Sequence, residues 1–248
     1  MLLGGELKKS LKHSLFSFIA LLAVVSLEAP ALASFSQQNV NIFSEEIEFL
    51  WEDDPIGLSI FLERTEERLP RFENSFKQSS VNLDVHWTLI AAISYQESHW
   101  NPKAISDTGV RGMMMLTQKT AKEMGIKKRT NAEQSILGGA NYFQKNLNRL
   151  PKEIPKLDKI WMALAGYNLG FVNISLAREL TLKNGGNPNL WSDVSIYLTK
   201  ILIERYANET NEFEKHVQAI EYVKRIQLYY QTLSILNREK EMLLLAVN

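Results

Sequence analysis

The chain has 248 residues, 45% of them hydrophobic and 23% charged, so it is long enough for one sizeable core and an appendage. Lysine and arginine together number 28, as do aspartate and glutamate, and this balance argues against nucleic acid as the main partner. Because the sequence contains no cysteine, we expect no disulfide framework, no cysteine nucleophile and no lipid-modified N-terminal cysteine.

Residues 1–33 have the pattern of a secretory signal peptide. Lysines precede the apolar run Leu15–Leu27, and the small residues around Ala31 and Ala33 fit a cleavage site. The run is shorter than the roughly 20 residues that a membrane-spanning helix needs, which makes an uncleaved anchor the weaker alternative. We therefore expect an exported protein.

Residues 34–80 form the next segment, a helical lead-in. Its start, 34–41, is polar and is expected to be disordered. Ile47 and Trp51 lie on one face of a first short helix, and a second helix through Phe61 is expected to end near Pro70.

The stretch from Asp84 to Glu97 predicts a helix with a glutamate in its last turn. Asp84 is a suitable N-cap, and Leu89 and Ile93 belong to an apolar face that Glu97 continues at its rim. Partial burial and the negative end of the helix dipole both disfavour a carboxylate there, so the Glu97 pKa should rise above about 4.3. A raised pKa suits a general acid.

A turn-rich loop follows this helix. Asn101-Pro102 should stop the helix, because a residue before proline avoids the helical region. Glycines at 109 and 112 bring the chain back, so Ser106 could hydrogen-bond the Glu97 carboxylate. As an isolated pattern, such a glutamate is more often a solvated helix end than a catalytic group.

The string E-S-H-W-N-P-K-A-I-S-D-T-G-V-R-G-M-M-M-L (97–116), followed by Thr120-Ala121, resembles the signature of the lytic transglycosylases. These goose-lysozyme-like enzymes cut the glycan strands of peptidoglycan. Met115 stands where the family usually has glutamine, and this triple-methionine form is similar to the membrane-bound lytic transglycosylase F branch. That branch carries a solute-binding-like module before its catalytic domain, which residues 34–80 are too few to hold.

Further helices are expected after the loop. Thr117 caps a short helix that Gly125 ends, and Asn131 with Gln134 resembles a capping box. The helix that this box opens should bury Ile136, Ala140, Phe143, Leu147 and Leu150. Later helices are expected over Leu157–Asn168 and over Phe171–Lys183, the second with an apolar face of Val172, Leu176 and Leu180.

Two later motifs extend the resemblance. Ala165-Gly166-Tyr167-Asn168-Leu169-Gly170 is similar to the family's Ala-Ala-Tyr-Asn-x-Gly motif, whose tyrosine faces the catalytic glutamate. Tyr222-Val223-x-x-Ile226 is similar to a third motif whose tyrosine lines the cleft. Because that string is also an ordinary core pattern, cleft and core remain equal alternatives for Tyr222.

We therefore expect a mainly α protein. Its segments would be a signal peptide (1–33), the lead-in (34–80), a lysozyme-like transglycosylase domain (81–232) and a C-terminal helical tail (233–248) at the end of a long helix. The apolar run Met242–Val247 in the tail could dock on the protein or on a membrane surface.

The resemblance implies non-hydrolytic cleavage between N-acetylmuramic acid and N-acetylglucosamine, leaving 1,6-anhydro ends, with Glu97 as acid and then base. Ser106, Met115, Tyr167, Asn168 and Tyr222 would bind substrate. It implies no metal and no cofactor, peptidoglycan strands as partner, and a place in the periplasm, free or peripheral on the outer membrane. The alternatives are a hydrolytic goose-type muramidase and a non-catalytic peptidoglycan-binding protein.

Overall fold

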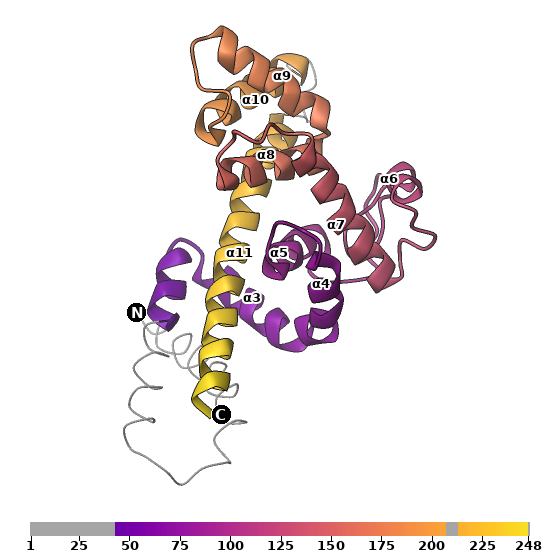
Figure 1. Cartoon of the computed structure of the whole chain (residues 1–248), viewed down its shortest axis with the longest axis vertical. Coiled ribbons are helices and arrows are strands. Elements are labelled where there is room, and N and C mark those ends of the chain that lie inside the picture. The colour runs from indigo at the N-terminus through magenta and orange to yellow at the C-terminus, as the bar shows by residue number, and fades with distance from the viewer. Residues whose placement is uncertain (1–42, 207–212, 248) are drawn as a thin grey trace. The chain divides into compact units, whose positions relative to one another are not determined.

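A computed structural model of the chain describes residues 43–206 and 213–247, and the predicted signal peptide and the polar segment 34–41 lie outside them. The described elements are helices, joined by loops that contain two isolated β-bridges (Figure 1). The mainly α prediction is confirmed, as is the long C-terminal helix, α11 (Phe213–Val247). Among the helices of the described ranges, none has both the length and the apolarity needed to cross a bilayer.

The chain folds as two compact units. One unit comprises the chain up to Arg71 together with the residues from Gln231 onward, and the other comprises Phe72–Tyr230. Helix α11 runs through the boundary and contributes residues to both units.

The first unit joins the lead-in to the end of the chain. Its described elements are a helix over 43–50, α3 (Pro55–Glu67), the 3-10 turn η1 (Leu69–Arg71) and the last part of α11. Trp51 is buried and donates from Nε1 to Thr232 Oγ1 over 2.9 Å, while its ring lies 5.6 Å from that of Phe61. Arg238 pairs with Glu46 at 3.3 Å. Segments from opposite ends of the sequence thus build one core.

The second unit carries the predicted catalytic motifs. Its elements are α4 (Glu73–Ser80), α5 (Trp87–Ser98), α6 (Gln118–Glu123), α7 (Ala132–Asn148), α8 (Lys156–Leu169), α9 (Phe171–Lys183), α10 (Trp191–Tyr206) and the first part of α11. Helix α4 packs on α5 and α7, α7 on α8, and α9 on both α8 and α10.

Helix α5 is the buried centre of this unit. Every residue from Trp87 to Tyr95 is buried, so the helix has no solvent-facing side over this length, which explains its nearly continuous apolar sequence. The predicted N-cap is wrong: the helix begins at Trp87, and His86 caps it through Nδ1, which accepts from the Thr88 backbone N–H at 3.5 Å and also lies 2.8 Å from Thr88 Oγ1. Asp84 lies in an exposed bend before the cap.

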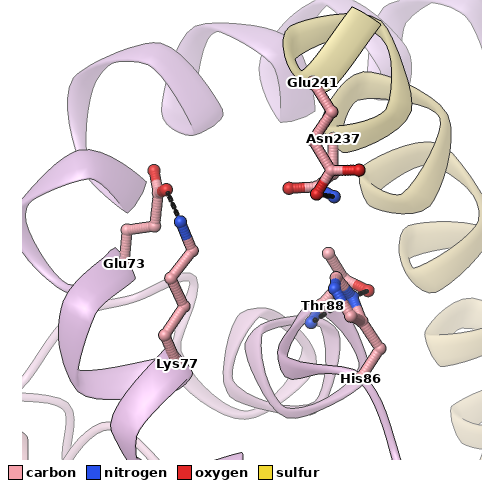
Figure 2. Close-up of polar contacts among 6 residues, drawn as sticks. All are labelled: Glu73, Lys77, His86, Thr88, Asn237 and Glu241. Atoms are coloured by element: carbon pink, nitrogen blue, oxygen red, sulfur yellow. Dashed lines mark hydrogen bonds and ion pairs between the residues drawn. The ribbon is translucent and has the colours of Figure 1, made fainter. Parts of the chain in front are cut away.

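Short-range polar contacts fix several helix ends and faces, three of them drawn in Figure 2. These are the His86 cap, the pair between Lys77 and Glu73 on α4 at 2.6 Å and, in the first unit, the bond from Asn237 to Glu241 on α11 at 2.9 Å. Exposed pairs of this kind contribute only about 0.5 kcal/mol each.

The predicted faces of the later helices are confirmed in part. The five apolar residues expected on α7 are all buried, and Thr117 and Asn131 cap α6 and α7 as expected. The face predicted for α9 is wrong, because Val172 is 73% exposed and the buried residues are Phe171, Ile174, Ala177 and Thr181. Both faces have helical spacing, and packing against α8 and α10 selects the second.

Candidate active site

Glu97 occupies the last turn of α5, where the chain reverses direction sharply. The helix ends at Ser98, earlier than the predicted stop at Asn101-Pro102, because His99 and Trp100 both adopt left-handed backbone conformations with φ of 51° and 58°. Two such non-glycine residues in succession are uncommon and need support from packing. Trp100 provides it: its ring is 1% exposed and its Nε1 donates to Ala91 O over 2.9 Å.

The side chain of Glu97 is half-buried, and its carboxyl is bonded to a tyrosine. Tyr222 of α11 donates its hydroxyl to Glu97 Oε1 over 2.6 Å. Burial raises the Glu97 pKa from 4.5 to about 7, and the hydrogen bond from Tyr222 opposes part of that rise. The raised pKa predicted from the sequence is confirmed, with burial as its main cause. Near neutral pH the side chain can therefore both give and take a proton.

Tyr222 is a buried residue whose hydroxyl contacts Glu97. Its side chain is buried, with 7% exposure, as a core residue would be, and its hydroxyl reaches the carboxylate of Glu97. Burial, followed by the charge of Glu97, raises the Tyr222 pKa well above its ordinary value. Tyr222 is therefore a phenol at all physiological pH values and acts as a hydrogen-bond donor.

Tyr167 lies close enough to Glu97 for the carboxylate charge to act on it, but its hydrogen bond goes elsewhere. Its hydroxyl donates to the carbonyl of Met114 over 2.8 Å, and its ring lies 5.1 Å from that of Tyr142. Burial raises the Tyr167 pKa well above its usual value, and the charge of Glu97 adds to this. The phenol thus connects α8 to the loop that follows α5.

Two serines on α5 hold the same loop from the other side. Ser98 and Ser94 both direct their hydroxyls at the carbonyl of Met113, at 2.9 and 3.1 Å. From the sequence, Ser98 was included only as one residue of the string 97–116, and Ser94 was missed. The available signal was a serine pair four residues apart, which places both hydroxyls on one face of an otherwise apolar helix.

The glycines of the loop permit its close packing. Gly112 has φ of 88°, and a Cβ atom there would lie 1.9 Å from the carbonyl oxygen of Arg129. A Cβ at Gly139 on α7 would lie 2.5 Å from the Met114 side chain. Both positions therefore require glycine, and the backbone of residues 112–116 is pressed against α7.

The predicted contact between Ser106 and Glu97 is not formed. Ser106 Oγ lies 3.0 Å from Thr108 Oγ1 and accepts from the Val110 backbone at 3.3 Å, so it closes its own turn. Among the described residues, the carboxylate of Glu97 receives its hydrogen bond from Tyr222 instead. The turn at Gly109, with φ of 79°, gives Ser106 nearer partners than Glu97.

Met115 and Asn168 complete the set of predicted site residues. Met115 is half-buried and has a left-handed backbone with φ of 44°, next to Met114, the partner of Tyr167. Asn168 is exposed one residue beyond Tyr167 in the last turn of α8. In the described ranges, no three histidine, aspartate or glutamate side chains converge as metal ligands.

Comparison with known proteins points to one family. Residues 74–188 match the transglycosylase SLT domain. The chain is 48% identical over 185 residues to the membrane-bound lytic murein transglycosylase F of Idiomarina loihiensis, covering 74% of this chain and 40% of that protein. It is 47% identical over 181 residues to the protein of that name from Photobacterium profundum, covering 73% and 35%.

The chain spans about two fifths of the length of these relatives. Among solved structures, the 70 kDa soluble lytic transglycosylase of Escherichia coli is 17% identical with a TM-score of 0.46, and the match covers 79% of this chain and 30% of that one.

Proposed function

We propose that the chain is a peptidoglycan lytic transglycosylase, because residues 74–188 match the transglycosylase SLT domain and the chain is 48% identical over 185 residues to a lytic murein transglycosylase. The observation that carries the proposal is the half-buried carboxyl of Glu97, with its pKa near neutrality and a phenol as its bonded partner. A group in that state can act first as an acid and then as a base.

The reaction needs one carboxyl group only. Protonated Glu97 gives its proton to the leaving glycosidic oxygen as the bond to C1 of N-acetylmuramic acid breaks. The C6 hydroxyl of the same sugar then attacks C1, and the Glu97 carboxylate takes the hydroxyl proton. The product is a 1,6-anhydro sugar, and the enzyme ends in its starting protonation state without using water.

The surroundings of Glu97 suit this scheme. Glycosidases that use a protein nucleophile or an activated water have two carboxylates about 5 to 10 Å apart. Among the described residues, no aspartate or glutamate contributes to the shift of the Glu97 pKa. An internal nucleophile makes a second carboxylate unnecessary. We assign substrate binding to Ser106, Met115, Tyr167 and Asn168, and both substrate binding and the orientation of Glu97 to Tyr222.

The products decide between this reaction and hydrolysis. Purified protein incubated with sacculi should release fragments whose masses are one water lower than those of hydrolytic muropeptides. Release of reducing ends at the hydrolytic mass would assign the chain to the muramidases. No release at all, with retained binding to sacculi, would favour the non-catalytic alternative.

The pH dependence of the rate should follow the Glu97 pKa. Only the protonated form starts the reaction, so kcat/KM should be constant below about pH 7 and fall about tenfold per pH unit above it. Initial rates on solubilised glycan strands between pH 5 and 9 test this. A rate that rises through pH 7 would show that Glu97 starts the reaction as a carboxylate.

Met115 should influence binding more than turnover. A thioether can only pack on a sugar, whereas the glutamine of other family members can hydrogen-bond it. Met115→Gln should therefore lower KM for glycan strands by about fivefold, equivalent to about 1 kcal/mol, with kcat little changed. Unchanged KM and kcat in steady-state assays would place Met115 outside the substrate-binding surface.

We also propose that the protein acts in the periplasm, exported by the signal peptide expected over residues 1–33. The similar proteins named above are described as membrane-bound. Cell fractionation, with an antibody that detects the chain, distinguishes a free periplasmic protein from one attached to the outer membrane. Recovery in the periplasmic fraction at low salt indicates a free protein, and recovery with outer membranes indicates peripheral attachment.

A further inference from the structure

A second feature of the Phe72–Tyr230 unit is a strongly basic hollow of about 1050 Å³, formed by α6, the loop after it and Arg111. We call it the basic hollow and define it by its six cations, Arg111, Lys119, Lys122, Lys127, Lys128 and Arg129. Segment 111–130 contains one acid, Glu123, which is ion-paired with Lys145. In a chain with equal numbers of acidic and basic residues, this concentration of positive charge is a local feature.

The basic hollow is held in shape by hydrogen bonds. Gln134 Oε1 accepts from the backbone N–H groups of Lys127 and Lys128, at 3.2 and 3.0 Å, instead of closing the predicted capping box. Arg129 Nη1 donates to the carbonyls of Leu116 and Gly109, at 2.7 and 3.2 Å. The wall of the hollow is therefore built before any ligand arrives.

Its remaining cations are exposed, and Glu123, which is ion-paired with Lys145, lies near Lys119. Arg111 and the four lysines are exposed, and within the described residues none of them is part of an ion pair. Like charges at close range repel one another and raise the local positive potential. Such a surface fits an anionic ligand.

The basic hollow and the candidate active site are connected by one loop. The loop that contributes Arg111 and Leu116 to this region continues through Met113 and Met114, whose carbonyls are held by Ser98 and Tyr167. A long polymer bound at Glu97 can therefore extend along this loop toward the cations.

We propose that the basic hollow binds the carboxylates of the peptide side chains that peptidoglycan carries, an inference that rests on the proposed function. Where the lactyl carboxyl of N-acetylmuramic acid is amide-linked to its peptide, the glycan carries no charge, so the negative charge of this substrate lies on its peptides. A concave site also suits a peptide better than the flat surface of a bilayer.

Binding of the full chain to insoluble sacculi tests the proposal. Glu97→Gln is used as the background so that cleavage does not complicate the measurement. Lys127→Glu/Lys128→Glu in this background is compared with Lys152→Glu/Lys156→Glu, which makes the same charge change at two exposed lysines outside the hollow. Each protein is co-sedimented with intact sacculi and with sacculi whose peptide carboxylates have been converted to amides by carbodiimide coupling with ammonia, which removes the charge and keeps the cross-links.

The hollow variant should bind intact sacculi about tenfold more weakly than its background, and the control variant within about twofold of it. The difference between the hollow and control variants should disappear on amidated sacculi and shrink in 1 M salt, where charges are screened beyond about 3 Å. Lys127→Gln/Lys128→Gln, which removes the charges without reversing them, should give a smaller loss in the same direction.

Three results would overturn the proposal. They are equal binding by the hollow and control variants, an equal loss on intact and amidated sacculi, and a loss confined to vesicles of anionic phospholipid. Failure of the unmutated chain to release anhydro products would overturn the proposed function alone, because the peptide-dependent binding is measured without cleavage.

Discussion

Glu97→Gln should reduce the release of anhydro-muropeptides by about a thousandfold or more. Proton transfer by one positioned group is worth about 10²- to 10⁴-fold, and here the same group serves both proton transfers. Glutamine keeps the size of the side chain and can still accept the hydrogen bond from Tyr222, so the loss reports proton transfer and not packing. Product release from sacculi, followed by mass spectrometry, measures it.

The same substitution should stabilise the protein at alkaline pH. The folded-state pKa of Glu97, about 7, lies above the ordinary value of 4.5, so the folded state binds the proton more tightly than the unfolded state does. Stability is therefore lost as the pH rises from about 4.5 to 7, and glutamine escapes this loss. For a half-buried group we expect a gain of about 2 kcal/mol at pH 8.

Thermal unfolding at pH 5 and pH 8 checks the stability effect. Glu97→Gln and the unmutated chain should unfold alike at pH 5 and separate at pH 8, while Glu52→Gln, at an exposed position, should track the unmutated chain at both. An active Glu97→Gln protein would remove Glu97 from the chemistry and with it the proposed mechanism.

Tyr222→Phe should reduce turnover by about 10- to 100-fold, because the carboxylate loses its charge-assisted hydrogen bond. The bond lowers the Glu97 pKa, so its removal should raise that pKa above about 7. The alkaline fall in kcat/KM should then begin at a higher pH than in the unmutated enzyme. If Tyr222 had a purely structural role, the substitution would lower activity without changing the pH at which kcat/KM begins to fall.

Tyr197→Phe is the matched control for this experiment. Tyr197 lies on α10 with Lys200 over its ring at 4.7 Å, a contact that phenylalanine preserves. Its pH profile should coincide with that of the unmutated enzyme. In Tyr222→Phe, the alkaline fall in kcat/KM could instead begin at the same pH as in the unmutated chain or at a lower pH. Either result would show that the phenol does not stabilise the Glu97 carboxylate.

The predictions that held concern short-range chemistry. Thr117 and Asn131 cap their helices because a side-chain oxygen satisfies backbone donors two or three residues away, whatever the rest of the fold does. The buried face of α7 follows from a single helical stripe of large apolar residues. The raised pKa of Glu97 follows from its place on the buried face of a terminal turn.

The predictions that failed required knowledge of competing partners. Asp84 and His86 are both able to cap α5, and the packing of Trp87 decides that the helix starts after His86. Ser106 was expected to reach Glu97, but Thr108 and Val110 lie nearer within its own turn. Two faces of α9 have helical spacing, one starting at Val172 and the other at Phe171. Packing against the neighbouring helices buries the face that starts at Phe171.

By itself, the sequence determined the helical class, the resemblance to the lytic transglycosylases and the acid to which we assign the chemistry. These depend on residue type and on spacing within one helix or loop. Only the tertiary structure decided that Tyr222, 125 positions from Glu97, is its bonded partner, and that Tyr167 instead holds the Met114 carbonyl. The physical reason is that a hydrogen bond between distant segments depends on the direction in which each helix packs, and several directions satisfy the same apolar pattern.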